Sequence, residues 1–279
     1  MTTTCTSNYT KLLNTLEELN MPALRANIST YIDLITSGDK NVTDALYELF
    51  EKEIEEKEKR TALYAVKTAG FPFEKRLKDY DFSFQPSVNK DEIIEYGSLR
   101  FIENNENLLF IGSPGTGKTH LATSIGIEAA MHHYSTYFIT MQELINQLKR
   151  AELENRLEAR LRHFQKYRLL IIDELGYLNM EEESANLFFQ LISRRYEKKS
   201  TIITSNKNLS KWSELFKDPV ITNAILDRLL HHSKVIQMIG PSYRTKDLIL
   251  ACYSHKILTL DGYTKLSLDS YSTCRCNQL

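Results

Sequence analysis

The residues at 112–119, GSPGTGKT, have the types and spacing of a loop that wraps around phosphate groups. Glycines let the backbone approach an anion closely, while backbone N–H groups and the start of a following helix supply positive potential. We expect Lys118 to reach the β- and γ-phosphates of a bound nucleotide, and Thr119 to ligate Mg²⁺ through its hydroxyl. The predicted nucleotide-binding set is Gly112, Ser113, Pro114, Gly115, Thr116, Gly117, Lys118, Thr119 and His120.

Two carboxylates close the apolar run LLIIDE at residues 169–174. Asp173, at the end of a buried strand beside the glycine-rich loop, can hold Mg²⁺ through its water shell. Glu174 is placed to orient or deprotonate a water molecule that attacks the γ-phosphate in line. A kinase would need a site for an acceptor, so the paired Asp and Glu favour hydrolysis. We predict an ATPase that converts ATP and water to ADP and phosphate.

Three polar residues further along the chain complete the predicted site. Asn206 follows the apolar run TIITS, where its amide can hold the attacking water or the γ-phosphate. Arg228 in ILDRLLHH (225–232) and Arg244 in SYR (242–244) can supply guanidinium groups to the charge that develops during hydrolysis. Alone, such an Asn is typical of a turn and such arginines of a surface, but the preceding motifs favour function.

The elements that must position these residues are short apolar strands that alternate with helices. Such runs occur at 108–111, 137–139, 169–172, 201–204 and 235–238. Five buried strands joined by crossover helices predict an α/β fold with a mostly parallel sheet. The first strand leads into the glycine-rich loop and then into a helical stretch at 120–131, which is the context that a phosphate-binding loop requires.

The residues before this α/β region predict a small helical module. Apolar spacing indicates two short helices over 9–34 and a longer one from residue 42, which ends in the charge run EKEIEEKEKR at 51–60. Mixed signs at i,i+4 spacing, as in Glu53 and Lys57, favour a solvated helix face over a nucleic-acid tail. We predict a helical module at 1–68, an extended aromatic-rich connector at 69–90, the α/β domain at 91–249 and a tail at 250–279.

Composition excludes several classes of protein. The chain has 279 residues and a net charge of −1, so it has no general attraction to nucleic acid. No apolar run is long enough to cross a bilayer, which makes the cytoplasm the expected location, without a membrane partner.

Cysteine and histidine patterns do not predict a metal site. The four cysteines lie near the termini, and the Cys274-Arg-Cys276 pair lacks further ligands. The adjacent pairs at 132–133 and 231–232 are histidines that would point in different directions on a helix. Neither pair has an acidic residue at ligand spacing, so we do not expect either to chelate a metal.

The series GSPGTGKT, LLIIDE, TIITSN, ILDRLLHH and SYR resembles the AAA+ ATPases of the IstB/DnaC type, which are transposition helpers and helicase loaders. The resemblance runs from about residue 8 to residue 249, and the connector LKDYDFSFQPSV looks like IstB. It implies that Lys118 and Thr119 belong to Walker A and Asp173 and Glu174 to Walker B. It further implies sensor 1 at Asn206, a trans-acting arginine finger at Arg228 and sensor 2 at Arg244.

An arginine finger implies that ATP lies between subunits, so the resemblance predicts a homo-oligomer. Arg194 and Arg195 could also face a neighbour, or they could form a basic helix C-terminus. The family implies binding of double-stranded DNA, and the segment 147–168, which we expect to be helical throughout, has a basic excess for contact with phosphates. A solvated face is the alternative for this segment, because three glutamates partly cancel its charge. With no base-reading helix, binding should be largely independent of sequence.

The leading functional hypothesis is an ATP-dependent, DNA-binding helper of a transposase, which remodels or selects target DNA. The alternatives are a DnaC-like replicative helicase loader and a non-hydrolysing DNA-binding module that uses ATP as a clamp. Glu174 argues against the last of these. The tail at 250–279 has no helical period and no family resemblance, and its composition favours a shifted or read-through coding end over a native extension.

Overall fold

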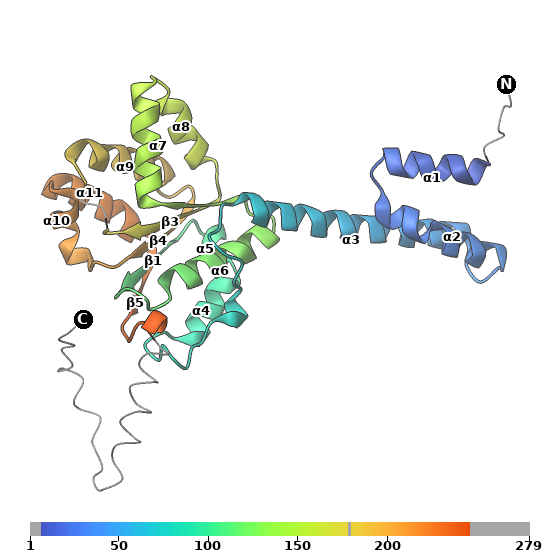
Figure 1. Cartoon of the computed structure of the whole chain (residues 1–279), viewed down its shortest axis with the longest axis horizontal. Helices are drawn as coiled ribbons and strands as arrows, with labels where there is room; N and C mark the ends of the chain where they lie inside the picture. Colours follow the sequence, from blue (N-terminus) through green and yellow to red (C-terminus); the bar gives the residue numbers. More distant parts are fainter. Residues whose placement is uncertain (1–6, 178–179, 246–279) are drawn as a thin grey trace, which may run out of the picture.

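The computed structural model of the chain describes residues 7–177 and 180–245. Three helices form an arm that projects from the rest of the molecule (Figure 1): α1 (Asn8–Glu18), α2 (Pro22–Thr36) and α3 (Val42–Thr68). Local sequence sets where they begin, since Pro22 occupies the first turn of α2 and the Asn41 side chain accepts a hydrogen bond from the N–H of Asp44. The predicted tail and all four cysteines lie outside the described residues.

The arm has a small core of its own, built from buried side chains of α1, α2 and α3: Leu16, Leu24, Ile28, Tyr31, Ala45 and Leu49. Glu53 of α3 is also buried, and this corrects the expectation of a fully solvated charge run. Its carboxylate accepts hydrogen bonds from the Leu24 N–H at 2.9 Å and from the Arg60 guanidinium at 3.1 Å. Glu53 therefore ties α3 to the start of α2 instead of pairing with Lys57.

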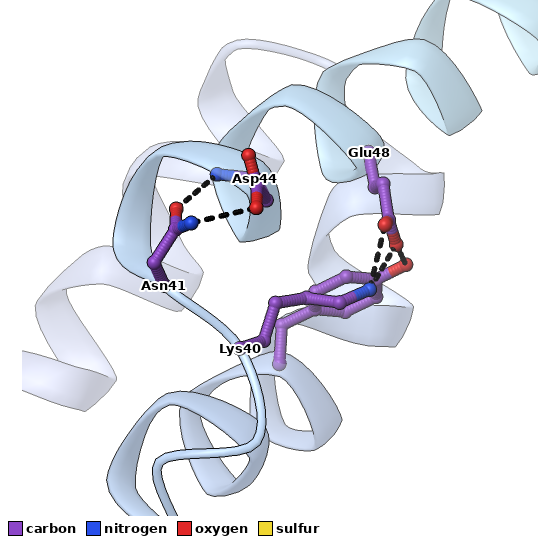
Figure 2. Close-up of polar contacts among 5 residues, drawn as sticks. Lys40, Asn41, Asp44 and Glu48 are labelled. Carbon is purple, nitrogen blue, oxygen red and sulfur yellow. Dashed lines mark hydrogen bonds and ion pairs between the residues drawn. The ribbon is translucent and has the colours of Figure 1, made fainter.

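A polar cluster closes the turn between α2 and α3 (Figure 2). Lys40 Nζ lies 2.6 Å from both oxygens of Glu48, and the Tyr31 hydroxyl donates to Glu48 Oε2 at 2.9 Å. The hydrogen bond to Glu48 raises the pKa of Lys40, while hydrogen bonds from Lys40 and then Tyr31 lower the pKa of Glu48. Beside this cluster, the Asn41 amide donates to Asp44 at 2.6 Å and reinforces the first turn of α3.

The rest of the described chain is built around a five-stranded sheet in the order β2-β3-β4-β1-β5. All four strand pairings are parallel, so the predicted α/β fold is confirmed. Parallel strands present their carboxyl ends at one edge, where the predicted site residues follow β1, β3 and β4. The strands are β1 (Asn107–Gly112), β2 (Thr136–Thr140), β3 (Leu169–Leu175), β4 (Ser200–Ser205) and β5 (Ser233–Met238).

Helices cover both faces of the sheet because its strands are apolar on both sides. Alternate residues of β3 show this, since Leu169 and Ile171 face one buried cluster and Leu170 and Ile172 face the other. The first face packs against α4 (Lys90–Gly97), α5 (Arg100–Glu103) and α6 (Lys118–Met131). The second packs against α7 (Met141–Leu153), α8 (Leu157–Gln165), α9 (Glu182–Arg195), α10 (Trp212–Phe216) and α11 (Pro219–Leu230).

The segment 147–168 is not helical throughout, which corrects the sequence prediction. Helix α7 ends at Leu153 and α8 begins at Leu157, with Asn155 in the left-handed conformation at φ +54°. Much of its basic excess is paired within the chain, since Lys149, Arg150, Arg156 and Arg162 each have a carboxylate partner within 4.0 Å. The solvated, ion-paired face therefore describes this segment well, and DNA contact there stays a prediction.

Helix α3 joins the arm to the α/β part through its final turns. Val66 packs against Ile127 and Ala130 of α6, and the Ala69 carbonyl accepts a hydrogen bond from the N–H of Phe138 at 2.8 Å. The arm is therefore anchored on the helix that begins at the glycine-rich loop. Among residues 7–177 and 180–245, no helix has the length and apolar character that a membrane span requires.

Candidate nucleotide-binding site

A cleft lies at the carboxyl ends of the strands, where the glycine-rich loop meets the ends of β3 and β4. Its walls come from four parts of the chain: the connector around Tyr80, the loop 114–120, the ends of β3 and β4 with Glu174 and Asn206, and the 3₁₀ turn at Tyr243–Thr245. The structure thus brings together most of the residues that the sequence predicts for nucleotide binding and catalysis.

The glycine-rich loop has the backbone shape of an anion cradle. Gly115 and Gly117 have φ values of +79° and +93°, which other residues rarely adopt, and Gly117 caps the start of α6. Lys118 is 8% exposed, and its Nζ donates to the carbonyl oxygens of Gly112 at 2.8 Å and Ser113 at 2.7 Å. Burial lowers the pKa of Lys118, with Arg244 adding to the effect and Asp173 opposing it.

Asp173 and Thr119 form the oxygen-rich part of the site. The Thr119 hydroxyl lies 3.0 and 3.1 Å from the two carboxylate oxygens of Asp173, and Thr204 donates to the same carboxylate. Asp173 is 4% exposed, and this burial raises its pKa despite both hydrogen bonds. A carboxylate and a hydroxyl at this spacing, in a site that disfavours an unpaired negative charge, fit Mg²⁺.

Glu174 and Asn206 both line the cleft. Glu174 is exposed and adopts a left-handed backbone at φ +64°, with its N–H donating to Thr204 Oγ1 at 3.0 Å. The Oδ1 of Asn206 is buried and has no hydrogen-bond partner among the described residues. A Cβ added to Gly176, where φ is +118°, would lie 2.3 Å from this oxygen.

The connector contributes cleft residues that the sequence analysis did not single out. Tyr80 is buried, donates to the Thr116 carbonyl at 3.2 Å and lies against Gly117, whose Cβ would be 2.7 Å from the Tyr80 ring. The ring of His120 packs edge-on against Tyr80 and Phe73, and burial lowers the pKa of His120. The concentration of aromatic residues in 71–87 was the available signal, although it predicted only a linker.

The two arginines predicted to act on the phosphates lie in different places. Arg244 lines the cleft, in a turn held to the glycine-rich loop by the hydrogen bond from the Tyr243 N–H to the Gly115 carbonyl at 2.8 Å. Arg228 does not line the cleft of its own chain. It lies on α11, where its guanidinium donates to Ala224 at 2.9 Å and stands 4.7 Å from the ring centroid of Phe189.

Arg195 cannot face a neighbouring subunit, so that expectation is wrong. Its side chain is 1% exposed, and it donates to the carbonyl oxygens of Phe164, Tyr167 and Ser200 and to the Thr201 hydroxyl. Burial lowers its pKa to about 9, which still leaves the guanidinium charged near neutral pH. Arg195 is a structural tie between the end of α9 and the starts of β3 and β4.

Comparison with protein families places most of the chain in one known family. The model of the IstB-like ATP binding protein family matches residues 14–251. The chain belongs to this family. The match spans the arm, the connector and the cleft, so each of these parts belongs to the IstB-like region of the chain.

Relatives of this IstB-like protein come from insertion sequences. It is 48% identical to the ATP-binding protein of insertion sequence IS232 from Bacillus thuringiensis, over 86% of this chain and 96% of the relative. It is 44% identical to the IS5376 protein of Geobacillus stearothermophilus, over 82% and 91% of the two chains. It is 40% identical to the IS21 protein of Pseudomonas aeruginosa, over 83% and 88%.

Solved structures confirm the P-loop AAA+ fold of the IstB-like chain. The crystal structure of DnaI gives a TM-score of 0.51 at 22% identity, over 59% of this chain and 91% of that chain. The replication initiator DnaA bound to AMPPCP and single-stranded DNA gives 0.51 at 18% identity, over 67% and 57%. At these identities the likeness establishes the fold, and function has to be argued from the site.

ATP fits the cleft of this IstB-like protein. Two left-handed glycines and the buried Lys118 form a cradle for phosphates, and the oxygens of Thr119 and Asp173 suit a divalent cation. The unpartnered Oδ1 of Asn206 marks a polar position that a ligand or its water can satisfy. The chain is an ATP-binding protein by family and by the chemistry of this cleft.

Proposed function

We propose that this protein hydrolyses ATP in the cleft and uses the cycle to act on DNA for a transposase. The observation that carries hydrolysis is that Glu174, which adjoins Asp173, lines the same cleft as Asn206 and the phosphate cradle. A clamp that only bound ATP would need the cradle but not a free carboxylate beside it. Asp173 and Thr119 would hold Mg²⁺, which would neutralise charge on the β- and γ-phosphates.

In this mechanism the oxygen of a water molecule forms a bond to the γ-phosphorus. At the same time the bond between the γ-phosphorus and the oxygen that bridges it to the β-phosphate breaks. Glu174 takes the proton of that water, and its exposed carboxylate is held toward the cleft because its backbone N–H is fixed on Thr204. The Asn206 amide orients the same water or the γ-phosphate, and Lys118 leaves its two carbonyl partners to contact the phosphates. Arg244, which also lines the cleft, contacts the γ-phosphate.

The location of Arg228 supports an active oligomer. Arg228 does not line the cleft of its own chain and lies half-buried on α11, so we expect it to contact a phosphate in another subunit. An arginine supplied in trans raises hydrolysis by roughly 10³- to 10⁵-fold in other nucleotide hydrolases. ATP would then lie between subunits of a homo-oligomer that binds double-stranded DNA largely independently of sequence.

The origin of the relatives favours a transposase as partner. The three relatives reported above are named as ATP-binding proteins of insertion sequences, and each aligns over at least 82% of this chain. For a helicase-loading role, the solved structures reported above offer likeness of fold alone, at 18–22% identity. We therefore infer that the ATP-bound oligomer remodels or selects target DNA and recruits the transposase.

Glu174→Gln tests hydrolysis. We expect ATP affinity to stay within about 3-fold, while DNA-stimulated phosphate release falls by roughly 10²- to 10⁴-fold, because the amide cannot accept a proton. Glu95→Gln is the matched control, since Glu95 is an exposed acidic residue of α4 away from the cleft. Equal turnover in wild type and Glu174→Gln would refute the role of Glu174.

Mixed oligomers test the intersubunit site. Arg228→Ala and Glu174→Gln should each be inactive alone, and mixing them should restore phosphate release, because some sites then combine an intact Glu174 with an intact neighbouring Arg228. Absence of restored activity, with oligomer formation verified by sedimentation, would place the arginine finger elsewhere.

A further inference from the structure

Glu197, His231 and His232 form a compact cluster on the surface away from the ATP cleft. Each offers one ligand atom, and these atoms all lie within 4.8 Å of one another. Glu197 Oε1 lies 3.4 Å from His231 Nδ1 and 3.5 Å from His232 Nε2. The three side chains are 50–52% exposed, so an ion could enter from solvent.

This convergence corrects the expectation that the two adjacent histidines point in different directions and have no acidic residue near them. That expectation assumed that both residues continue a helix, but α11 ends at Leu230 and His231 is its C-cap. The two rings therefore lie together, with centroids 4.1 Å apart. Glu197 lies in the turn after α9 and has a left-handed backbone at φ +56°. It contacts His231, which is more than thirty positions away in the sequence, so spacing along the chain could not reveal this contact.

The distances match those of a bound transition-metal ion. Zn²⁺ binds histidine nitrogen at about 2.0–2.1 Å and carboxylate oxygen at about 2.0–2.2 Å, so two ligand atoms on one tetrahedral ion lie about 3.4 Å apart. The two distances from Glu197 Oε1 are 3.4 and 3.5 Å. Two imidazoles, one carboxylate and a water molecule are a common ligand set for Zn²⁺.

We propose that Glu197, His231 and His232 bind a divalent transition-metal ion, with Zn²⁺ as the ion that the ligands favour. The bound ion fastens the end of α11 to the turn between α9 and β4. Arg228 lies one turn before His231 on α11 and contacts Phe189 of α9, so the ion braces the two helices that hold Arg228 in place. The proposal stands independently of the role of Arg228 in hydrolysis.

The Tyr196 hydroxyl would compete with a metal ion for His231 Nδ1. Its hydroxyl lies 2.8 Å from His231 Nδ1, which is the nitrogen that faces Glu197. A metal ion would take the place at Nδ1 that the hydroxyl now occupies, so the Tyr196 hydroxyl must turn away on binding. Tyr196→Phe removes that competition while it keeps the ring in place.

Titration of the full-length protein with Co²⁺ tests the proposal, because Co²⁺ in a tetrahedral site gives visible absorption and Zn²⁺ displaces it. The protein is expressed without a histidine tag and with serine in place of each thiol that could bind metal, at Cys5, Cys252, Cys274 and Cys276. We expect one equivalent of Co²⁺ per chain, complete displacement by Zn²⁺, and a higher melting temperature with Zn²⁺.

Single substitutions identify the ligands. His232→Ala and Glu197→Gln should each weaken Zn²⁺ binding by at least about 10-fold, the lower bound seen when only an outer partner of a ligand is removed. Tyr196→Phe should bind Zn²⁺ at least as tightly as wild type. His132→Ala/His133→Ala is the matched control, an adjacent pair without a carboxylate in such a cluster among the described residues.

Three results would overturn the proposal. The first is absence of Co²⁺ absorption at millimolar metal, which would leave the cluster as an ordinary His–Glu ion pair. The second is equal metal affinity in wild type, His232→Ala and Glu197→Gln. The third is loss of binding in the His132/His133 control, with folding of every variant verified by circular dichroism.

Discussion

Gly117→Ala probes how the connector supports the phosphate-binding loop. Gly117 has a φ of +93°, and a Cβ there would lie 2.7 Å from Cε2, 3.1 Å from Oη and 3.3 Å from Cζ of Tyr80. The substitution therefore imposes a backbone penalty and a collision with a buried ring. Because Tyr80 also donates to the Thr116 carbonyl, the ring cannot withdraw without disturbing the loop.

The two costs can be separated. A left-handed backbone costs a residue with a Cβ about 1–2 kcal/mol, and forcing a methyl group into packed surroundings costs about 1–3 kcal/mol. Central values sum to about 3.5 kcal/mol, which lowers the melting temperature of a domain of this size by roughly 7–14 °C. In a Tyr80→Leu background the collision is removed, so only about half of that decrease should remain.

The four proteins are the wild type, Gly117→Ala, Tyr80→Leu and the double variant. Their thermal unfolding, followed by circular dichroism, measures how strongly the effects of the two substitutions depend on each other. Binding of a fluorescent ATP analogue measures the affinity of each protein for nucleotide. We expect Gly117→Ala to weaken ATP binding by at least about 10-fold, because the Thr116–Gly117 peptide must shift. Gly38→Ala is the comparator, since Gly38 has a φ of +81° and nothing within 4 Å of its Cβ position, so it carries the backbone penalty alone. An identical decrease in stability in the wild-type and Tyr80→Leu backgrounds would refute the collision with Tyr80.

Three further outcomes are expected. Lys118→Ala should abolish ATP binding in a filter assay, because it removes the cation that the loop 112–119 offers to the phosphates, and retained affinity would contradict its role. Arg195→Met should destabilise the protein by about 3–5 kcal/mol in urea unfolding, because it leaves buried carbonyl groups without their hydrogen-bond donor. Arg194→Met should cost under about 1 kcal/mol, because it removes an ion pair with the exposed Glu158. Glu48→Gln should lower the melting temperature of the protein at pH 7, and this difference should shrink as the pH falls below about 4.5. The hydrogen bond with Lys40 is the chief cause of the lowered pKa of Glu48, so its contribution is complete above the unfolded-state value and is lost as pH falls through the folded-state value.

The sheet and the phosphate loop could be predicted because local signals specify them. Strand β3 reads as an uninterrupted apolar run because both of its faces are covered, and its end is marked by Asp173. The loop at 112–119 carries its conformation in its own glycines. The roles predicted for Glu174, Asn206, Arg228 and Arg244 stay predictions, although three of these four residues do lie on the cleft.

Contacts between distant segments could not be predicted from one sequence. Tyr80 reaches Gly117 only because the connector folds back over the start of α6, and nothing in its local pattern indicates this. The charge pattern at 51–60 likewise gave no sign that Glu53 is buried, because its partner, the N–H of Leu24, is a backbone group that every residue possesses. The helix break at Asn155 depends on a single left-handed residue in an otherwise helical composition.

The anchorage of α3 makes the arm a lever. Helix α3 has 27 residues and its last turns rest on α6, the helix whose first residue is Lys118 (Figure 1). A helix of this length spans about 40 Å, so a rotation of α6 by about 10° would swing the far end of α3 through about 7 Å. Any movement of α6 at the nucleotide would therefore be larger at α1 and α2 than at the phosphate-binding loop.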